Sequence, residues 1–157
     1  MATARTFLAA LCLALSGCAA TGQPEPSPAA EVTTDGEVTI PADLVISSPR
    51  ICAALAVYEL SEHDDWGLRA TIAGTALNGF RAAERVPNCA AGVAVALTKN
   101  FSERRWLLAL EAVDAVTSGS YSVPLACARA TAVVPLSAAD ARAHCVIYDL
   151  AFVGGAQ

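Results

Sequence analysis

Four cysteines in the body of this 157-residue chain constrain its fold more than any other feature: Cys52, Cys89, Cys127 and Cys145. An even number of cysteines in a short exported domain predicts a framework of disulfide bonds. Four cysteines allow three pairings, and sequence alone does not decide among them. We favour Cys52 with Cys145 and Cys89 with Cys127, which would tie the first helix to the last strand. The alternative is a set of buried free thiols.

The composition argues against a metal site and against nucleic-acid binding. No Cys-x-x-Cys occurs, and His63 and His144 lack ligand spacing, so we expect neither a metal nor a cofactor. The net charge is −5, and the arginines are scattered apart from the adjacent pair Arg104 and Arg105. Because nucleic-acid binding needs a basic patch to displace phosphate counterions, no nucleic-acid partner is expected.

The first 17 residues have the pattern of an export signal. Arg5 gives a positive start, and residues 7–15 form an apolar run that is too short for a permanent membrane helix. The sequence Leu-Ser-Gly-Cys then ends at Cys18 and matches the bacterial lipobox. This resemblance implies cleavage before Cys18 and attachment of acyl chains there, each buried methylene contributing ~0.8 kcal/mol to anchoring. The alternative is an ordinary signal peptide whose cleavage site happens to precede a cysteine.

The resemblance also implies a location. In the enterobacterial sorting rule, Ala19 after the lipidated cysteine favours the outer membrane, with the protein facing the periplasm. Residues 18–37 are rich in proline, serine, threonine, glycine and acids, which predicts a flexible linker after the lipidated cysteine. We therefore divide the chain into a signal peptide (1–17), a lipidated linker (18–37) and one globular domain (38–157).

Within that domain, the apolar spacing predicts helices first and strands last. Ser48 and Pro49 are typical of a helix start, and the helices are expected at 51–62, at 65–84 and from Ser102 to Gly119. Residues 89–98 could form either a loop or a short helix. Strands are expected at 130–134 and 144–153, joined by 135–143, with Val146, Tyr148, Leu150 and Phe152 on one face. This order predicts a small α+β fold with a C-terminal β-hairpin.

One group of side chains suggests chemistry. Glu59, Glu62, Asp64 and Asp65 lie where the first helix gives way to a loop. A glutamate held against apolar neighbours at such a junction can keep its proton and act as a general acid on a glycosidic bond. Tyr58 and Trp66 could supply the apolar wall and a stacking surface for sugars. The alternative is that these acids are solvated and cap the next helix.

The same region resembles the SleB-type cell-wall hydrolases. The resemblance is carried by Ala56-Val57-Tyr58, by Gly67 and Asn78, and further on by residues 115–119, 129–131 and 152–153. It implies a small helical, lysozyme-like domain that cleaves peptidoglycan. The chain departs from the family where the catalytic glutamate is expected. Counting from Gly67 reaches Glu59, whereas counting from Tyr58 reaches Leu60, and Gly79 replaces an arginine.

Two functions follow as hypotheses. In the first, the protein is a lipid-anchored muramidase or lytic transglycosylase. Glu59 is then the acid, Glu62 the fallback, and Asp64, Asp65, Tyr58 and Trp66 contact the substrate. In the second, it is a non-catalytic envelope lipoprotein that uses the same fold to bind peptidoglycan or an envelope protein. In both, Cys18 attaches the protein to the membrane.

Overall fold

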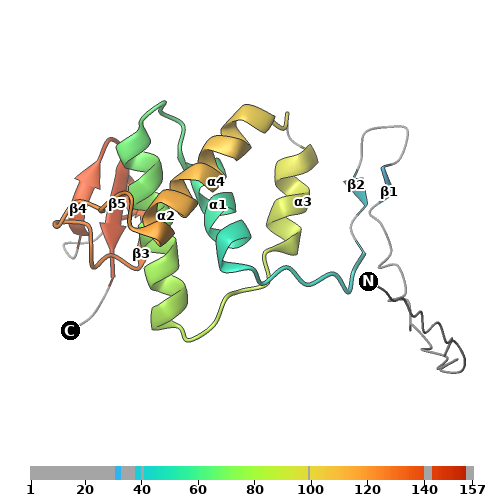
Figure 1. Ribbon diagram of the computed structural model, residues 1–157, viewed down its shortest axis with the longest axis horizontal. Coiled ribbons are helices and arrows are strands. Elements are labelled where there is room, and N and C mark those ends of the chain that lie inside the picture. The colour runs from blue at the N-terminus through green and yellow to red at the C-terminus, as the bar shows by residue number, and fades with distance from the viewer. Residues whose placement is uncertain (1–30, 33–37, 40, 99, 140–142, 155–157) are drawn as a thin grey trace, which may run out of the picture.

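The computed structural model describes residues 31–32, 38–39, 41–98, 100–139 and 143–154. In this part of the chain, four helices pack beside a three-stranded antiparallel sheet, which confirms the expected α+β class (Figure 1). The sheet and helix α3 lie at opposite ends of the helical layer. The signal peptide and Cys18 lie outside the described residues. No helix in the described ranges is long and apolar enough to cross a membrane.

One short hairpin begins inside the segment that we expected to be a linker. Strand β1 (Glu31–Val32) pairs antiparallel with β2 (Val38–Thr39), and β2 contacts α3. Valine and threonine are β-branched and favour extended backbone, which accounts for the pairing.

Local capping chemistry sets the limits of the first two helices. The Ser48 side chain accepts from the Ile51 N–H, and Pro49 opens helix α1 (Pro49–Leu60), as predicted. Helix α1 ends two residues before its predicted limit, because Ser61 leaves helical geometry while its N–H still bonds to Val57. Asp65 caps helix α2 (Trp66–Ala82), accepting from the Leu68 N–H at 2.7 Å.

The third and fourth helices follow the same logic. Residues Ala90–Thr98 form helix α3, the short-helix alternative for this segment. Ser102 caps helix α4 (Glu103–Ser118), and Gly119 ends it in the left-handed region at φ 74°. Glycine has no Cβ and adopts that conformation at little cost, so the predicted stop at Gly119 is confirmed.

Small side chains bring α1, α2 and α4 close together. All three helices contact one another, and Ala53, Ala54, Ala73 and Ala112 are fully buried between them. At Gly74 of α2, an added Cβ would lie 2.5 Å from the Val123 side chain. A core of this kind depends on close backbone approach rather than on large side chains.

The predicted single strand over 144–153 is wrong. It is two strands, β4 (Ala143–Ile147) and β5 (Leu150–Val153), separated by a turn in which Tyr148 has φ 54°. Strand β5 also pairs with β3 (Ala132–Pro135), giving the order β3-β5-β4. The expected common face is therefore lost: Tyr148 is 52% exposed, whereas Leu150 and Phe152 are buried.

The four domain cysteines form two disulfides, as predicted, but the pairing is different. Cys52 bonds to Cys89, and Cys127 bonds to Cys145. Cys89 reaches the start of α1 because the segment before α1 runs beside it, with the Cys89 N–H donating to Ile46 O at 2.8 Å. Asn88 fastens the same segment, accepting from the Ile46 N–H and donating to Leu44 O. The first disulfide therefore joins α1 to the segment before α3, and the second joins the segment before β3 to β4.

Candidate functional site

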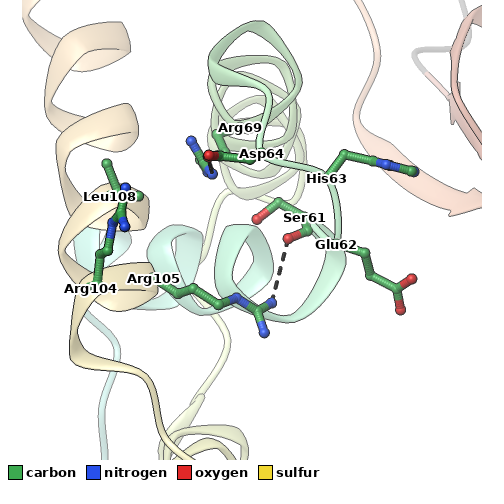
Figure 2. Close-up of a pocket in the computed structure, with 8 residues that line it drawn as sticks. All are labelled: Ser61, Glu62, His63, Asp64, Arg69, Arg104, Arg105 and Leu108. Carbon is green, nitrogen blue, oxygen red and sulfur yellow. Dashed lines mark hydrogen bonds and ion pairs between the residues drawn. The ribbon is translucent and has the colours of Figure 1, made fainter.

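The loop between α1 and α2, residues 61–65, lies at the edge of a small cavity. The cavity has a volume of about 200 Å³ and is lined by residues 61–64 of the loop, by Arg69 of α2 and by Arg104, Arg105 and Leu108 of α4 (Figure 2). We call it the arginine pocket. Three guanidinium groups in one hollow are notable in a chain whose net charge is −5.

Arg69 and Asp64 form an ion pair on one side of the arginine pocket. The side chain of Arg69 is only 10% exposed, whereas that of Asp64 is 81% exposed. The hydrogen bond from Arg69, followed by its charge, lowers the pKa of the Asp64 carboxyl below its usual value. Asp64 is therefore ionised at neutral pH and serves as the partner of Arg69.

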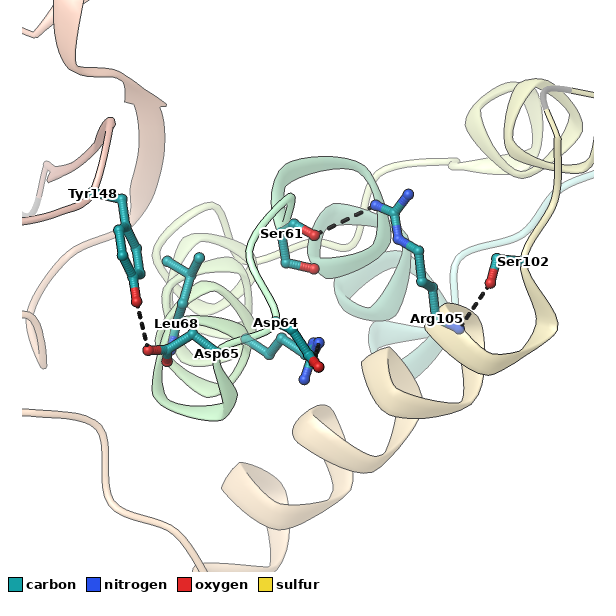
Figure 3. A network of polar contacts seen from close by, with 8 residues as sticks. Ser61, Asp64, Asp65, Leu68, Ser102, Arg105 and Tyr148 are labelled. Atoms are coloured by element: carbon teal, nitrogen blue, oxygen red, sulfur yellow. Dashed lines mark hydrogen bonds and ion pairs between the residues drawn. The ribbon is translucent and has the colours of Figure 1, made fainter.

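The two arginines of α4 differ in their bonding. Arg105 Nη2 donates to Tyr58 O at 2.7 Å and fixes the end of α1. It also donates to Ser61 O at 3.4 Å (Figure 3). Arg104 is exposed and has no hydrogen-bond partner among the residues that the structure describes. Its charge helps to lower the pKa of Asp64, but its N–H groups bond to no described residue and could donate to an anion.

The two candidate acids are both exposed. Glu59 lies on the side of α1 nearest α3, where its Oε1 would be 3.9 Å from a Cβ built at Gly92. Glu62 lies in the loop, and its side chain points away from Arg69 and Arg104 (Figure 2). Burial, on which the general-acid hypothesis depends, is absent at both positions.

Tyr58 belongs to the core rather than to an open cleft. It is only 7% exposed, and its ring packs against Phe101 and Trp106. Its hydroxyl oxygen accepts from the Ser102 N–H at 2.9 Å, at the start of α4. The ring therefore supports the helices, and none of its faces is open for stacking on a sugar.

Asp65 joins the helices to the sheet. One carboxylate oxygen caps α2, and the other accepts from the Tyr148 hydroxyl at 3.0 Å (Figure 3). The Leu68 N–H and then the Tyr148 hydroxyl lower the pKa of Asp65. The His63 ring stacks on Tyr148 with centroids 4.2 Å apart. These contacts dock the turn between β4 and β5 onto the loop.

Trp66 faces a second cavity. This cavity has a volume of about 430 Å³ and is lined chiefly by Trp66, Tyr121, Glu111, Asp114, Ser118 and Ser120. We call it the aromatic pocket. The structure thus brings Glu62 and Asp64 together with arginines that the sequence analysis had not assigned to a site, and it separates Trp66 from them.

The adjacent pair Arg104 and Arg105 was the one available sequence signal for the arginine pocket. Among the described residues, no group of His, Cys, Asp and Glu side chains comes together in a way that could hold a metal ion.

Comparisons with protein-family models, curated proteins and solved structures find no match to this chain.

Proposed function

We propose that this chain is a lipid-anchored envelope protein whose folded domain binds an anionic envelope polymer, peptidoglycan foremost, without cleaving it. The observation that carries the proposal is the arginine pocket, lined by Arg104, whose exposed guanidinium makes no hydrogen bond to a described residue. Guanidinium groups bind carboxylates and phosphates through paired, charge-assisted hydrogen bonds. Peptidoglycan presents carboxylates on its peptide stems, so it offers the complementary charge.

The setting of the carboxyl groups argues for binding rather than hydrolysis. A general acid must hold its proton near neutral pH, which requires burial or a neighbouring negative charge. Glu59 and Glu62 are exposed, and the pKa values of Asp64 and Asp65 are lowered by their hydrogen-bond donors. None of the four is both buried and free of hydrogen-bond donors, as a general acid of this kind would be.

The lipid anchor is supported by the lipobox that ends at Cys18. The Cys18→Ala variant should lose the anchor and partition into the aqueous phase in a detergent phase separation, or it should stay uncleaved. If it is processed and partitions like the wild type, the anchor proposal is wrong.

The binding proposal is tested by cosedimentation of the full chain, solubilised in detergent, with purified peptidoglycan sacculi. Arg104→Ala should weaken binding about tenfold, the equivalent of ~1.4 kcal/mol, because it removes a charge-assisted contact. Arg129→Ala is the matched control, since Arg129 is also exposed and does not line the pocket. Binding of the wild type should also weaken as salt is raised. Equal binding by both variants would contradict the role of the arginine pocket.

Cleavage of peptidoglycan remains the second candidate function. It is favoured by the resemblance to SleB-type hydrolases and by Glu62, which lines the edge of the arginine pocket. Zymography on peptidoglycan separates the two candidates. Clearing by the wild type that is lost in Glu62→Gln or Glu59→Gln would establish a hydrolase, whereas binding without clearing supports the non-catalytic proposal.

A further inference from the structure

The arginine pocket and the aromatic pocket lie along one face of α4. Arg104 and Leu108 line the first, and Glu111, Ala115 and Ser118 line the second. Steps of three and four residues keep side chains on the same face of a helix. At a rise of ~1.5 Å per residue, this stripe is about 20 Å long, which is longer than a single sugar ring.

The start of α2 joins the two pockets from the other side. Asp64 lines the arginine pocket, and Trp66, two residues later, lines the aromatic pocket. The junction between the loop and α2 therefore borders both pockets. Together they form an extended surface that is cationic at one end and aromatic and acidic at the other.

The aromatic pocket combines two kinds of surface. Trp66 and Tyr121 are partly exposed and supply apolar ring area. Glu111 is exposed and has no hydrogen-bond partner in the described part of the chain. Asp114 is held in place by Arg50, which donates to both of its carboxylate oxygens at 2.7 and 2.8 Å. The pocket therefore offers flat rings beside carboxylate acceptors.

Gly67 helps to keep Tyr121 in the aromatic pocket. A Cβ built at Gly67 would lie 3.3 Å from the Tyr121 hydroxyl oxygen, which is tighter than an ordinary contact. The missing side chain lets this hydroxyl approach the first turn of α2, so the ring of Tyr121 shares the cavity with Trp66.

We infer that the aromatic pocket is a saccharide subsite. A pyranose ring has an apolar face of C–H groups that packs on an aromatic ring, and hydroxyl groups at its rim that donate to carboxylates. Trp66 and Tyr121 provide the first kind of contact, and Glu111 provides the second. The inference rests on the proposed function, because a polymer with a sugar backbone and anionic branches would place its sugar here and its anion in the arginine pocket.

The test uses chitotetraose, a neutral tetramer of N-acetylglucosamine that offers nothing to the arginine pocket. Titrated into the full chain in detergent and followed by NMR, it should shift the indole N–H of Trp66 and the amides of Gly67 and Tyr121. The Trp66→Ala variant should lose at least tenfold in affinity. Leu125→Ala is the matched control, since Leu125 is exposed and lies outside both pockets.

A second variant protects the test against a folding defect. Glu111→Gln leaves the packing unchanged, because Glu111 is exposed, and should weaken chitotetraose binding severalfold. Unchanged affinity in both Trp66→Ala and Glu111→Gln, or no binding by the wild type, would overturn the inference. If chitotetraose fails to bind while sacculi still bind through Arg104, only the subsite is refuted. If chitotetraose binds through Trp66 and sacculi binding does not depend on Arg104, only the arginine-pocket proposal is refuted.

Discussion

The part of the molecule that holds α1 to α4, the helical half, and the part after Gly119 that holds β3 to β5, the sheet half, each contain one disulfide. They are built differently. In the helical half, α1 is buried over most of its length, α2 over its first half and α4 at Ala109, Ala112 and Val113, and Cys52 joins that core. In the sheet half, the buried residues are Cys127, Ala130 and three residues of the central strand β5, whereas none in the described strands β3 and β4 is fully buried. One half is held together by packing, and the other depends on its disulfide and on docking.

The two halves meet through polar contacts and through a shared core, which together we call the joint. Asn78 of α2 donates to Ala128 O at 2.9 Å and to Ala130 O at 3.1 Å, just before β3 begins. On the other side, Tyr148 reaches Asp65. Phe152 of β5 is fully buried in the shared core. We expect the sheet half to open locally at lower free energy than the helical half.

Removal of either disulfide should cause the largest loss of stability among these variants. The two losses should differ between the helical half and the sheet half. The bonded cysteines are 37 residues apart in the helical half and 18 in the sheet half. In the chain-entropy model, the serine double variants lose about 4 and about 3 kcal/mol of unfolding free energy, respectively. Urea denaturation measures both losses.

Hydrogen exchange then tests where each loss falls. Without Cys127–Cys145, the amides of β4 and β5 should exchange faster while those of α1 stay protected. Without Cys52–Cys89, exchange should rise throughout the domain. Equal changes in both halves for both variants would contradict the comparison.

A smaller loss of stability is expected for a substitution at Gly79 of α2, which lies where the helical half contacts the sheet half. A Cβ at Gly79 would lie 2.5 Å from the backbone oxygen of Thr131, which cannot move without shifting the sheet. Gly79→Ala should therefore cost about 1–3 kcal/mol in thermal or urea unfolding.

Gly92 of α3 is the matched control. A Cβ there would also lie at 2.5 Å, but from Cδ2 of Leu55, the mobile end of a side chain. Alanine stabilises a helix relative to glycine by up to ~1 kcal/mol, which offsets the cost of moving the Leu55 side chain. Gly92→Ala should therefore change the stability little. A Gly92→Ala variant as unstable as Gly79→Ala would show that the joint is no stiffer than the helix packing.

The smallest effect concerns acid sensitivity at Asp65. Its pKa is lowered in the folded state, so its contribution is present above the unfolded value of about 4 and is lost as the pH falls through the folded pKa. Asp65→Ala should cost about 1 kcal/mol at pH 7 through loss of the cap, and the difference from wild type should shrink towards pH 2.

Ser102→Ala is the control for that prediction. Ser102 also caps a helix, α4, with its side chain accepting from the Arg105 N–H at 3.3 Å. Serine does not titrate in this range, so the cost of Ser102→Ala should stay constant with pH. Parallel pH profiles for the two variants would be evidence against the Asp65 mechanism.

Local chemistry made much of the helical half predictable. Ser48 with Pro49, Ser102 and Gly119 mark helix limits by interactions within a few residues, and the sequence displays them directly. The strand break at Tyr148 was not predictable in this way. A positive φ at a residue other than glycine is uncommon, and here the turn is held by a distant partner, Asp65.

The same limit applies to the disulfides and to the candidate site. The pairing of Cys52 with Cys89 depends on which segments run side by side, and spacing along the chain does not reveal that. The sequence predicted that the acids of the α1–α2 loop would lie together. It did not predict that Arg69, Arg104 and Arg105 would converge on them from two helices.

The Cys52–Cys89 bond also determines which residues bear the force when the chain is pulled. A pull on the chain before Leu44 first strains the hydrogen bonds that fasten Leu44 and Ile46 to Asn88 and Cys89. Once these hydrogen bonds break, the force acts on Cys52. The disulfide transmits it to Cys89 and on towards α3. When the chain is pulled between its two ends, residues 53–88 lie outside this force path, so the helix that carries Arg69 and Trp66 is not stretched.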